Sequence, residues 1–124
     1  MNVILWIIAS VLALAFLAAG AMKLAQPREK LVAAGMAWAG DYPAGAVKAI
    51  GGAEVLGALG LILPAVFGVA PALVAWAALG LAVTMAGAAV VHARRKENQA
   101  IAINLVLLVL TVLVAWGRFG PHAF

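Results

Sequence analysis

Four long apolar stretches alternate with short polar breaks along the chain. They cover residues 3–22, 44–63, 72–91 and 100–117. Each is close to the roughly 20 residues that an α-helix needs to cross the hydrocarbon core of a bilayer. The pattern therefore predicts an all-α protein, a four-helix transmembrane bundle that forms one domain over residues 1–124.

The first apolar stretch has a second interpretation, a cleaved signal peptide. Ala19, Gly20 and Ala21 resemble a small-residue cleavage site. However, a signal peptide begins with basic residues, and here no lysine or arginine precedes the stretch, whereas Lys23 follows it. We expect a first spanning helix, with cleavage as the alternative.

A polar segment separates the first two stretches. Pro27 can begin a helix there, because the N–H that proline lacks would be unpaired in the first turn. Tryptophan and tyrosine favour the level of the lipid headgroups. We predict a short interfacial helix around residues 27–38, with an irregular loop as the alternative. Four residues have spacings compatible with one face of it: Leu31, Ala34, Trp38 and Tyr42.

Composition and charge agree with a membrane protein. Hydrophobic residues make up 68% of the chain and charged residues 10%, whereas the apolar share of soluble domains is about one half. The net charge of +4 is small, so we expect no nucleic-acid partner. Because basic residues mark cytoplasmic loops, we place the two basic linkers in the cytoplasm and both termini outside. The basic linker residues are Lys23, Arg28, Lys30, Arg94, Arg95 and Lys96.

Glu54 lies in the middle of the second stretch, within the Gly-rich run 51–64. A charged side chain at the bilayer centre costs at least about 2.5 kcal/mol, so it usually faces a partner, a cavity or a ligand. At about 100° per residue, Gly51, Glu54 and Ala58 share one helix face, and small residues let a neighbouring helix approach. We expect Glu54 to point into the protein, as a ligand-binding group or as a carboxylate that only orders the bundle.

Two lysines are candidates for the same site. Lys48 lies six residues before Glu54 on a different helix face, so it is not a partner at i, i+4 spacing. Lys23, at the end of the first stretch, is the better candidate because its long side chain can reach toward Glu54. Alternatively, Lys23 extends its ammonium group to the headgroups.

Three more candidates lie in the cytoplasmic half of the third and fourth stretches. Met85 and His92 are seven residues apart and share a helix face. Met85 is either core filler or a ligand contact, and His92 either exchanges protons with the cytoplasm or is solvated surface. Asn104 begins a polar stripe that continues at Thr111 and Arg118 and is predicted to hydrogen-bond across the bundle. Asn104 is thus either a structural contact or a ligand contact.

Several chemistries are excluded. The chain has no cysteine, which removes disulfides, thiol catalysis and thiolate metal centres. His92 and His122 belong to opposite membrane faces, so they cannot hold one haem together. No second buried carboxylate accompanies Glu54 for a metal pair. We predict no metal site and no covalent cofactor, and the sequence identifies no catalytic residue.

Pieces of all four stretches point to one family. Residues 20–24 end the first stretch, residues 48–64 form most of the second, residues 85–88 and His92 lie in the third, and Asn104 lies in the fourth. In this order they resemble the DoxX-like family of small four-helix bacterial membrane proteins, over nearly the full chain. The resemblance implies a multi-pass protein of the bacterial inner membrane.

The resemblance also implies a function. Some relatives are named for a subunit of thiosulfate:quinone oxidoreductase, and others are similar to proteins linked with catechol and quinone stress. It therefore implies a quinone- or small-lipophile-binding accessory protein in redox or quinone-stress metabolism, with a bound quinone as its ligand. As an enzyme the chain would be at most an accessory subunit. Thiol-dependent sulfur chemistry is not expected, because cysteine is absent.

Two other functions fit the same residues. In a small-molecule or proton-coupled carrier, Glu54 would be the buried titrating group. In an oligomeric scaffold, glycine and alanine faces would join copies of the chain. The expected partners are membrane lipid, together with a second copy of the chain or a redox subunit.

Overall fold

Helices make up nearly all of the structure, a computed structural model that describes residues 1–123 apart from the side chain of Arg28. No strand occurs in this part of the chain. Four of the helices are long and apolar enough to cross a membrane. The predicted all-α four-helix transmembrane bundle is confirmed. The elements are α1 (Asn2–Ala25), α2 (Arg28–Ala33), the 3₁₀ helix η1 (Ala37–Asp41), α3 (Ala44–Phe67), α4 (Leu73–Arg94) and α5 (Asn98–Phe119).

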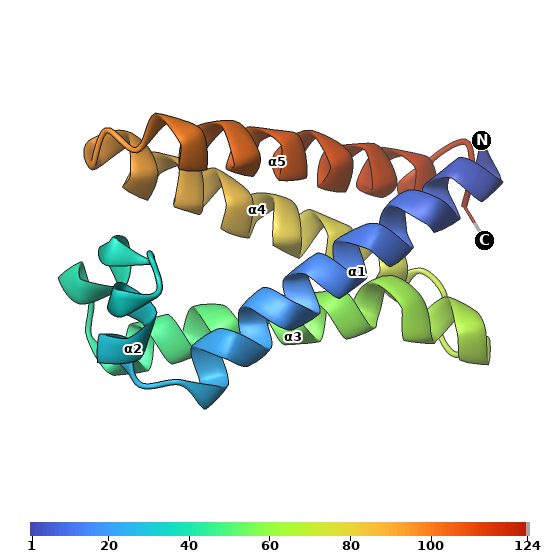
Figure 1. The fold of residues 1–124 in the computed structure, drawn as a ribbon. Helices are drawn as coiled ribbons and strands as arrows, with labels where there is room; N and C mark the ends of the chain where they lie inside the picture. Colours follow the sequence, from blue (N-terminus) through green and yellow to red (C-terminus); the bar gives the residue numbers. More distant parts are fainter. Residues whose placement is uncertain (124) are drawn as a thin grey trace.

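The four long helices form two pairs. α1 packs along α3 and α5 packs along α4, while α3 and α4 join the pairs. α1 meets α5 near the chain termini, which lie at one end of the bundle, and the two helices diverge toward α2 and η1 at the other end (Figure 1). The packing between the pairs is therefore uneven along the bundle.

Two glycines let α1 and α3 approach closely. A Cβ atom built on Gly20 would lie 2.6 Å from the carbonyl oxygen of Gly51, and one on Gly51 would lie 2.7 Å from Cβ of Lys23. Larger residues at these positions would push the backbones apart. The close approach of α1 and α3 at Gly20 and Gly51 therefore determines the position of Lys23 against α3.

The end that holds the termini is closed by tight packing. Leu5 of α1 is fully buried, and a Cβ on Gly117 of α5 would lie 2.5 Å from its Cδ1. Arg118 is buried beside it and donates hydrogen bonds to Oδ1 of Asn2, at 2.6 Å, and to the carbonyl oxygen of His122, at 2.8 Å. These contacts join α1 and α5 at this end.

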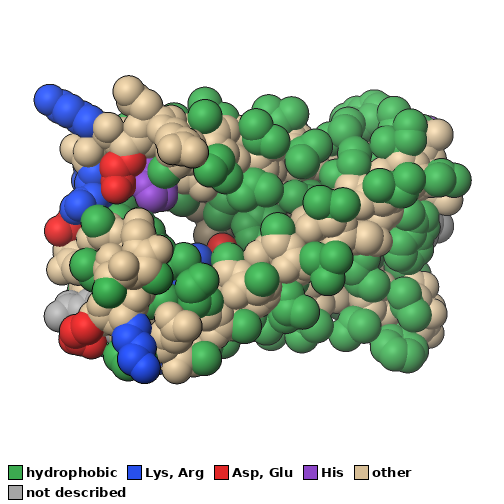
Figure 2. All heavy atoms as spheres, viewed as in Figure 1, with side chains coloured by type: hydrophobic (Ala, Val, Ile, Leu, Met, Phe, Trp, Pro, Cys, Tyr) green, Lys and Arg blue, Asp and Glu red, His purple; other side chains and the backbone are tan. Residues whose placement is uncertain are grey.

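Apolar side chains cover the outside of the long helices. Leu14, Leu56 and Val83 are each about 70% exposed, at 70%, 72% and 67%. Figure 2 shows charged side chains gathered at the end that holds α2 and η1, with hydrophobic side chains over the rest of the viewed face. An apolar surface of this extent is typical of a lipid-facing wall.

The second span is longer than predicted. It was expected to end before Pro64, but α3 continues through Pro64 to Phe67. Proline inside a helix removes one i→i−4 hydrogen bond, and its ring crowds the carbonyl of the preceding turn. Membrane-spanning helices tolerate proline because neighbouring groups satisfy the freed backbone carbonyl. Gly68 ends the helix instead, with a left-handed φ of 68°.

The short helix between the first two spans is also present, but it is shorter than predicted. α2 ends at Ala33, and Gly35 follows with a φ of 105°. That backbone angle does not continue a helix and is typical of glycine. The prediction of one helical face from Leu31 to Trp38 is therefore wrong, because Leu31 belongs to α2 and Trp38 to η1.

Candidate functional site

A cavity of about 830 Å³ lies where the two helix pairs diverge. All four long helices contribute to its wall, and η1 covers the end near α2. Figure 2 shows it open on the viewed face, with acidic and basic side-chain atoms inside the opening. Its volume is within the range of pockets for drug-sized ligands, which are about 300–1,000 Å³.

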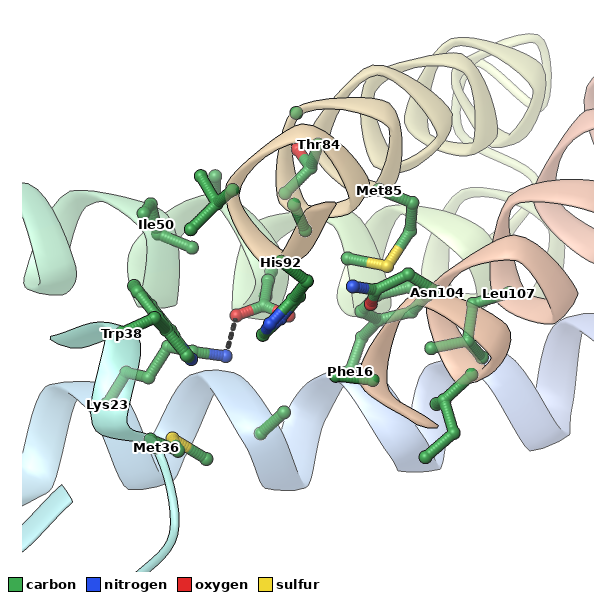
Figure 3. A pocket seen from close by; sticks show the side chains of 18 of the residues that line it. Phe16, Lys23, Met36, Trp38, Ile50, Thr84, Met85, His92, Asn104 and Leu107 are labelled. Carbon is green, nitrogen blue, oxygen red and sulfur yellow. Dashed lines mark hydrogen bonds and ion pairs between the residues drawn. The ribbon is translucent and has the colours of Figure 1, made fainter. Parts of the chain in front are cut away.

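An ion pair lies in the wall of the cavity, inside the membrane-spanning region. Nζ of Lys23 donates to Oε1 of Glu54 at 2.5 Å (Figure 3). Lys23 is 7% exposed and Glu54 is 3% exposed. Lys23 therefore points inward and does not extend to the headgroups. Gly51, Glu54 and Ala58 are all buried on one face of α3, as their spacing predicts.

Trp38 of η1 lies over this ion pair. Nζ of Lys23 is 5.9 Å from the centroid of the Trp38 ring, a distance at which the ring face attracts a cation. The indole also contacts the ring of His92 edge to face, with centroids 6.4 Å apart. η1 thus places an aromatic wall against the polar part of the cavity.

Asn104 of α5 is a buried polar group without a complete set of partners. It is 8% exposed and lines the cavity next to Met85, and its amide points toward the side where His92 lies (Figure 3). Within residues 1–123, its Nδ2 has no hydrogen-bond partner. A buried donor left unpaired costs about 1–3 kcal/mol. A ligand oxygen that reached Nδ2 would relieve this cost.

His92 belongs to the rim of the cavity. Its Nδ1 lies 2.9 Å from Oε1 of Glu97, and its side chain is only 14% exposed. The interpretation of His92 as solvated surface is therefore wrong, because Trp38 and Glu97 enclose the ring. Nearby, Arg95 forms an ion pair with Asp41, which ties η1 to the linker between α4 and α5.

The other two candidates occupy different places. Met85 is 4% exposed, belongs to the main hydrophobic core and also lines the cavity, so both interpretations of it fit. Lys48 is exposed and lies outside the cavity wall, where its Nζ donates to the carbonyl oxygen of Leu24 at 2.9 Å. The structure therefore does not support Lys48 as a ligand-binding residue, since its ammonium caps the end of α1.

The predicted polar stripe on α5 crosses the bundle only in part. Asn104, Thr111 and Arg118 are all buried. Of these, Arg118 reaches α1, whereas the Thr111 hydroxyl lies 2.9 Å from the carbonyl oxygens of Leu107 and Leu108 in its own helix. A threonine hydroxyl in a helix can bond the carbonyl oxygen three or four residues before it instead of a group on a neighbouring helix.

Sequence reasoning missed several wall residues. Trp38 and Tyr42 were placed at the headgroup level, yet both line the cavity. Phe16 lines it too. Its position seven residues before Lys23, on the same face of α1, is a signal that could have identified it.

Comparison with known proteins identifies a family. The model of the DoxX-like family matches residues 7–114. The matched region includes Lys23, Glu54 and Asn104. No curated protein and no solved structure matches the chain.

Proposed function

The chain belongs to the DoxX-like family and spans a membrane several times, and on this premise we propose that it binds a quinone or a similar small lipophilic ring compound. The binding site is the cavity between the helix pairs. The protein acts as an accessory protein in redox metabolism or in the response to quinone stress. The bound quinone supplies the redox chemistry, and residues of the chain bind and orient it.

One observation carries this proposal: an unpaired polar group faces an apolar cavity beside a buried ion pair. Quinone oxygens accept hydrogen bonds, and Nδ2 of Asn104 is a donor without a partner in the described chain. Nζ of Lys23 is a second donor, and the carboxylate of Glu54 is an acceptor for the hydroxyl of a quinol. The side chains of Phe16 and Trp38 supply apolar surface against which the quinone ring can pack.

The same groups favour an uncharged ligand. Lys23 and Glu54 neutralise one another, and the amide of Asn104 carries no charge. A free anion or cation would have to leave water without meeting a net opposite charge, which is costly in an apolar site. A quinone has polar oxygens and no net charge, so it avoids this cost.

The closed end of the bundle favours a ligand-binding protein over a membrane carrier. A carrier opens its site alternately to both sides of the membrane. Here the packing of Leu5 against Gly117 and the hydrogen bonds of Arg118 join α1 and α5 at the end opposite the cavity. The alternatives remain a carrier that uses Glu54 and a scaffold without chemistry.

The quinone content of the purified protein tests the proposal. The protein is produced in quinone-containing bacterial membranes and purified in mild detergent, and its organic extract is analysed by mass spectrometry. We expect quinone enriched severalfold over an unrelated four-helix membrane protein purified in parallel. Equal quinone content, together with solute flux into liposomes that depends on Glu54, would support the carrier instead.

We further propose a bacterial inner-membrane location, with the basic linkers in the cytoplasm and both termini outside. The support is the concentration of charge at one end of the bundle (Figure 2). A reporter that is active only outside the cytoplasm should be active at the C-terminal end and inactive after Arg95. The opposite pattern would contradict the orientation.

A further inference from the structure

We propose that the ligand enters the cavity from the bilayer, through an opening between α1 and α5, and keeps a long apolar tail in the lipid. This inference rests on the proposed function and names its ligand class: a quinone with an isoprenoid-like chain, not a tail-free solute. The ring would lie against Lys23 and Asn104, and the tail would leave between the two helices that carry them.

The opening has defined edges, and we call it the α1–α5 window. Ala15 and Ala19 of α1 form one edge, and Ala100 and Ile103 of α5 form the other. All four line the cavity, Ala15 is exposed, and Ile103 is 55% exposed. Three of the four are alanines, so little side-chain volume fills the space between the helices.

The window faces lipid and not water. Ala15 lies near the middle of α1 and Ile103 lies within α5, both inside the segments that can span the membrane. Around it, the outer surface is apolar, with Leu14 and Val106 at 70% and 58% exposure. A ligand dissolved among acyl chains would therefore reach the cavity without crossing an aqueous phase.

The water-facing end of the cavity is covered. η1 lies across it, with Trp38 against the ring of His92 and Asp41 paired with Arg95. A ligand entering from the cytoplasm would have to move this segment. On the membrane side, three of the four residues at the edges of the α1–α5 window are alanines.

The cavity has a second exposed side, between α3 and α4. Ala53 of α3 and Val83 of α4 line it and are exposed, Val83 at 67%. The nearby Thr84 hydroxyl is already bonded to the carbonyl oxygen of Gly80, at 2.9 Å. The unpaired donor Asn104 and the ammonium of Lys23 instead flank the α1–α5 window, which is why the tail is assigned to that side.

Blocking the window tests the assignment. Ala15→Phe with Ile103→Phe is compared, in lipid nanodiscs, with a control block, Leu14→Phe with Val106→Phe. Leu14 and Val106 are exposed on the same two helices and lie outside the cavity wall. The two probes are tetramethyl-1,4-benzoquinone, which has no tail, and a benzoquinone with a long isoprenoid chain. Binding is read from quenching of Trp38, with Trp38→Phe as the background. The single substitutions are measured as well, and thermal unfolding verifies that each variant is folded.

We expect the α1–α5 block, Ala15→Phe with Ile103→Phe, to weaken binding of the tailed quinone at least tenfold more than it weakens binding of the tail-free quinone. The control block should change neither by more than about twofold. Unchanged binding of the tailed quinone in the α1–α5 block would overturn the inference, as would a loss confined to the control block. If the wild-type protein binds neither probe, the proposed function itself fails, and this result is distinct from the other two.

Discussion

Replacing Lys23 with methionine is expected to lower the free energy of unfolding by about 3–5 kcal/mol, the usual cost of removing one member of a buried ion pair. The loss comes from Glu54, which is 3% exposed and would keep a carboxylate with no cation beside it. The methionine itself is a minor disturbance, because it is flexible and apolar. The measurement is reversible unfolding in mixed detergent and lipid micelles.

The double variant Lys23→Met with Glu54→Gln should recover most of this loss, because no unpaired charge is left. Lys48→Met is the matched control: it removes the same group from an exposed lysine whose Nζ bonds only a backbone carbonyl in the structure. We expect it to cost less than about 1 kcal/mol. Additive losses in the double variant would show that Lys23 and Glu54 do not act as a pair.

This ion pair also shows what sequence could predict about the site. The spacing of Gly51, Glu54 and Ala58 predicts the buried face of α3, because helix geometry alone places them together. The partner of Glu54 was left open, since Lys23 could turn inward or toward the headgroups. The choice depends on how closely α1 approaches α3 at Gly20, which is a property of packing and not of local sequence.

Two helix boundaries differ from those predicted, one at Pro64 and one at Gly35. A span that ends before Pro64 is the simplest prediction from sequence, but α3 continues through this proline and ends at Gly68, which has a left-handed φ. Gly35 was not recognised as a break, although its φ of 105° separates α2 from η1. As a result the position of Trp38 over Lys23 was not foreseen.

The unpaired state of Asn104 is a further feature that sequence cannot reveal. A polar stripe at seven-residue spacing predicts burial of Asn104, Thr111 and Arg118, and all three are buried. Whether each finds a partner depends on the atoms opposite it in the folded bundle. Thr111 bonds its own helix, Arg118 reaches Asn2, and Asn104 faces a cavity.

Replacing Asn104 with leucine is therefore expected to change ligand binding and stability in opposite directions. Leucine has a similar size and removes an unpaired buried donor, so without ligand the protein should be as stable as wild type or more stable, by up to about 1–3 kcal/mol. The same change removes a hydrogen bond to the ligand. A loss of 1.4 kcal/mol corresponds to about a tenfold weaker Kd.

Thr111→Val is the matched control on the same helix. Thr111 is buried seven residues beyond Asn104, lies outside the cavity wall and bonds only its own helix in the structure. We expect this variant to bind the ligand as wild type does. The pair of variants separates an effect on the cavity from a general effect of removing a buried polar group from α5.

The measurement that tests the central claim most directly is a titration of the protein with tetramethyl-1,4-benzoquinone, read from quenching of Trp38, with thermal unfolding recorded on the same samples. We expect saturable binding by wild type and Thr111→Val. For Asn104→Leu we expect about tenfold weaker binding, with unfolding at the same or a higher temperature. Binding of equal strength in Asn104→Leu and wild type, or a lower unfolding temperature for Asn104→Leu, would contradict the central claim.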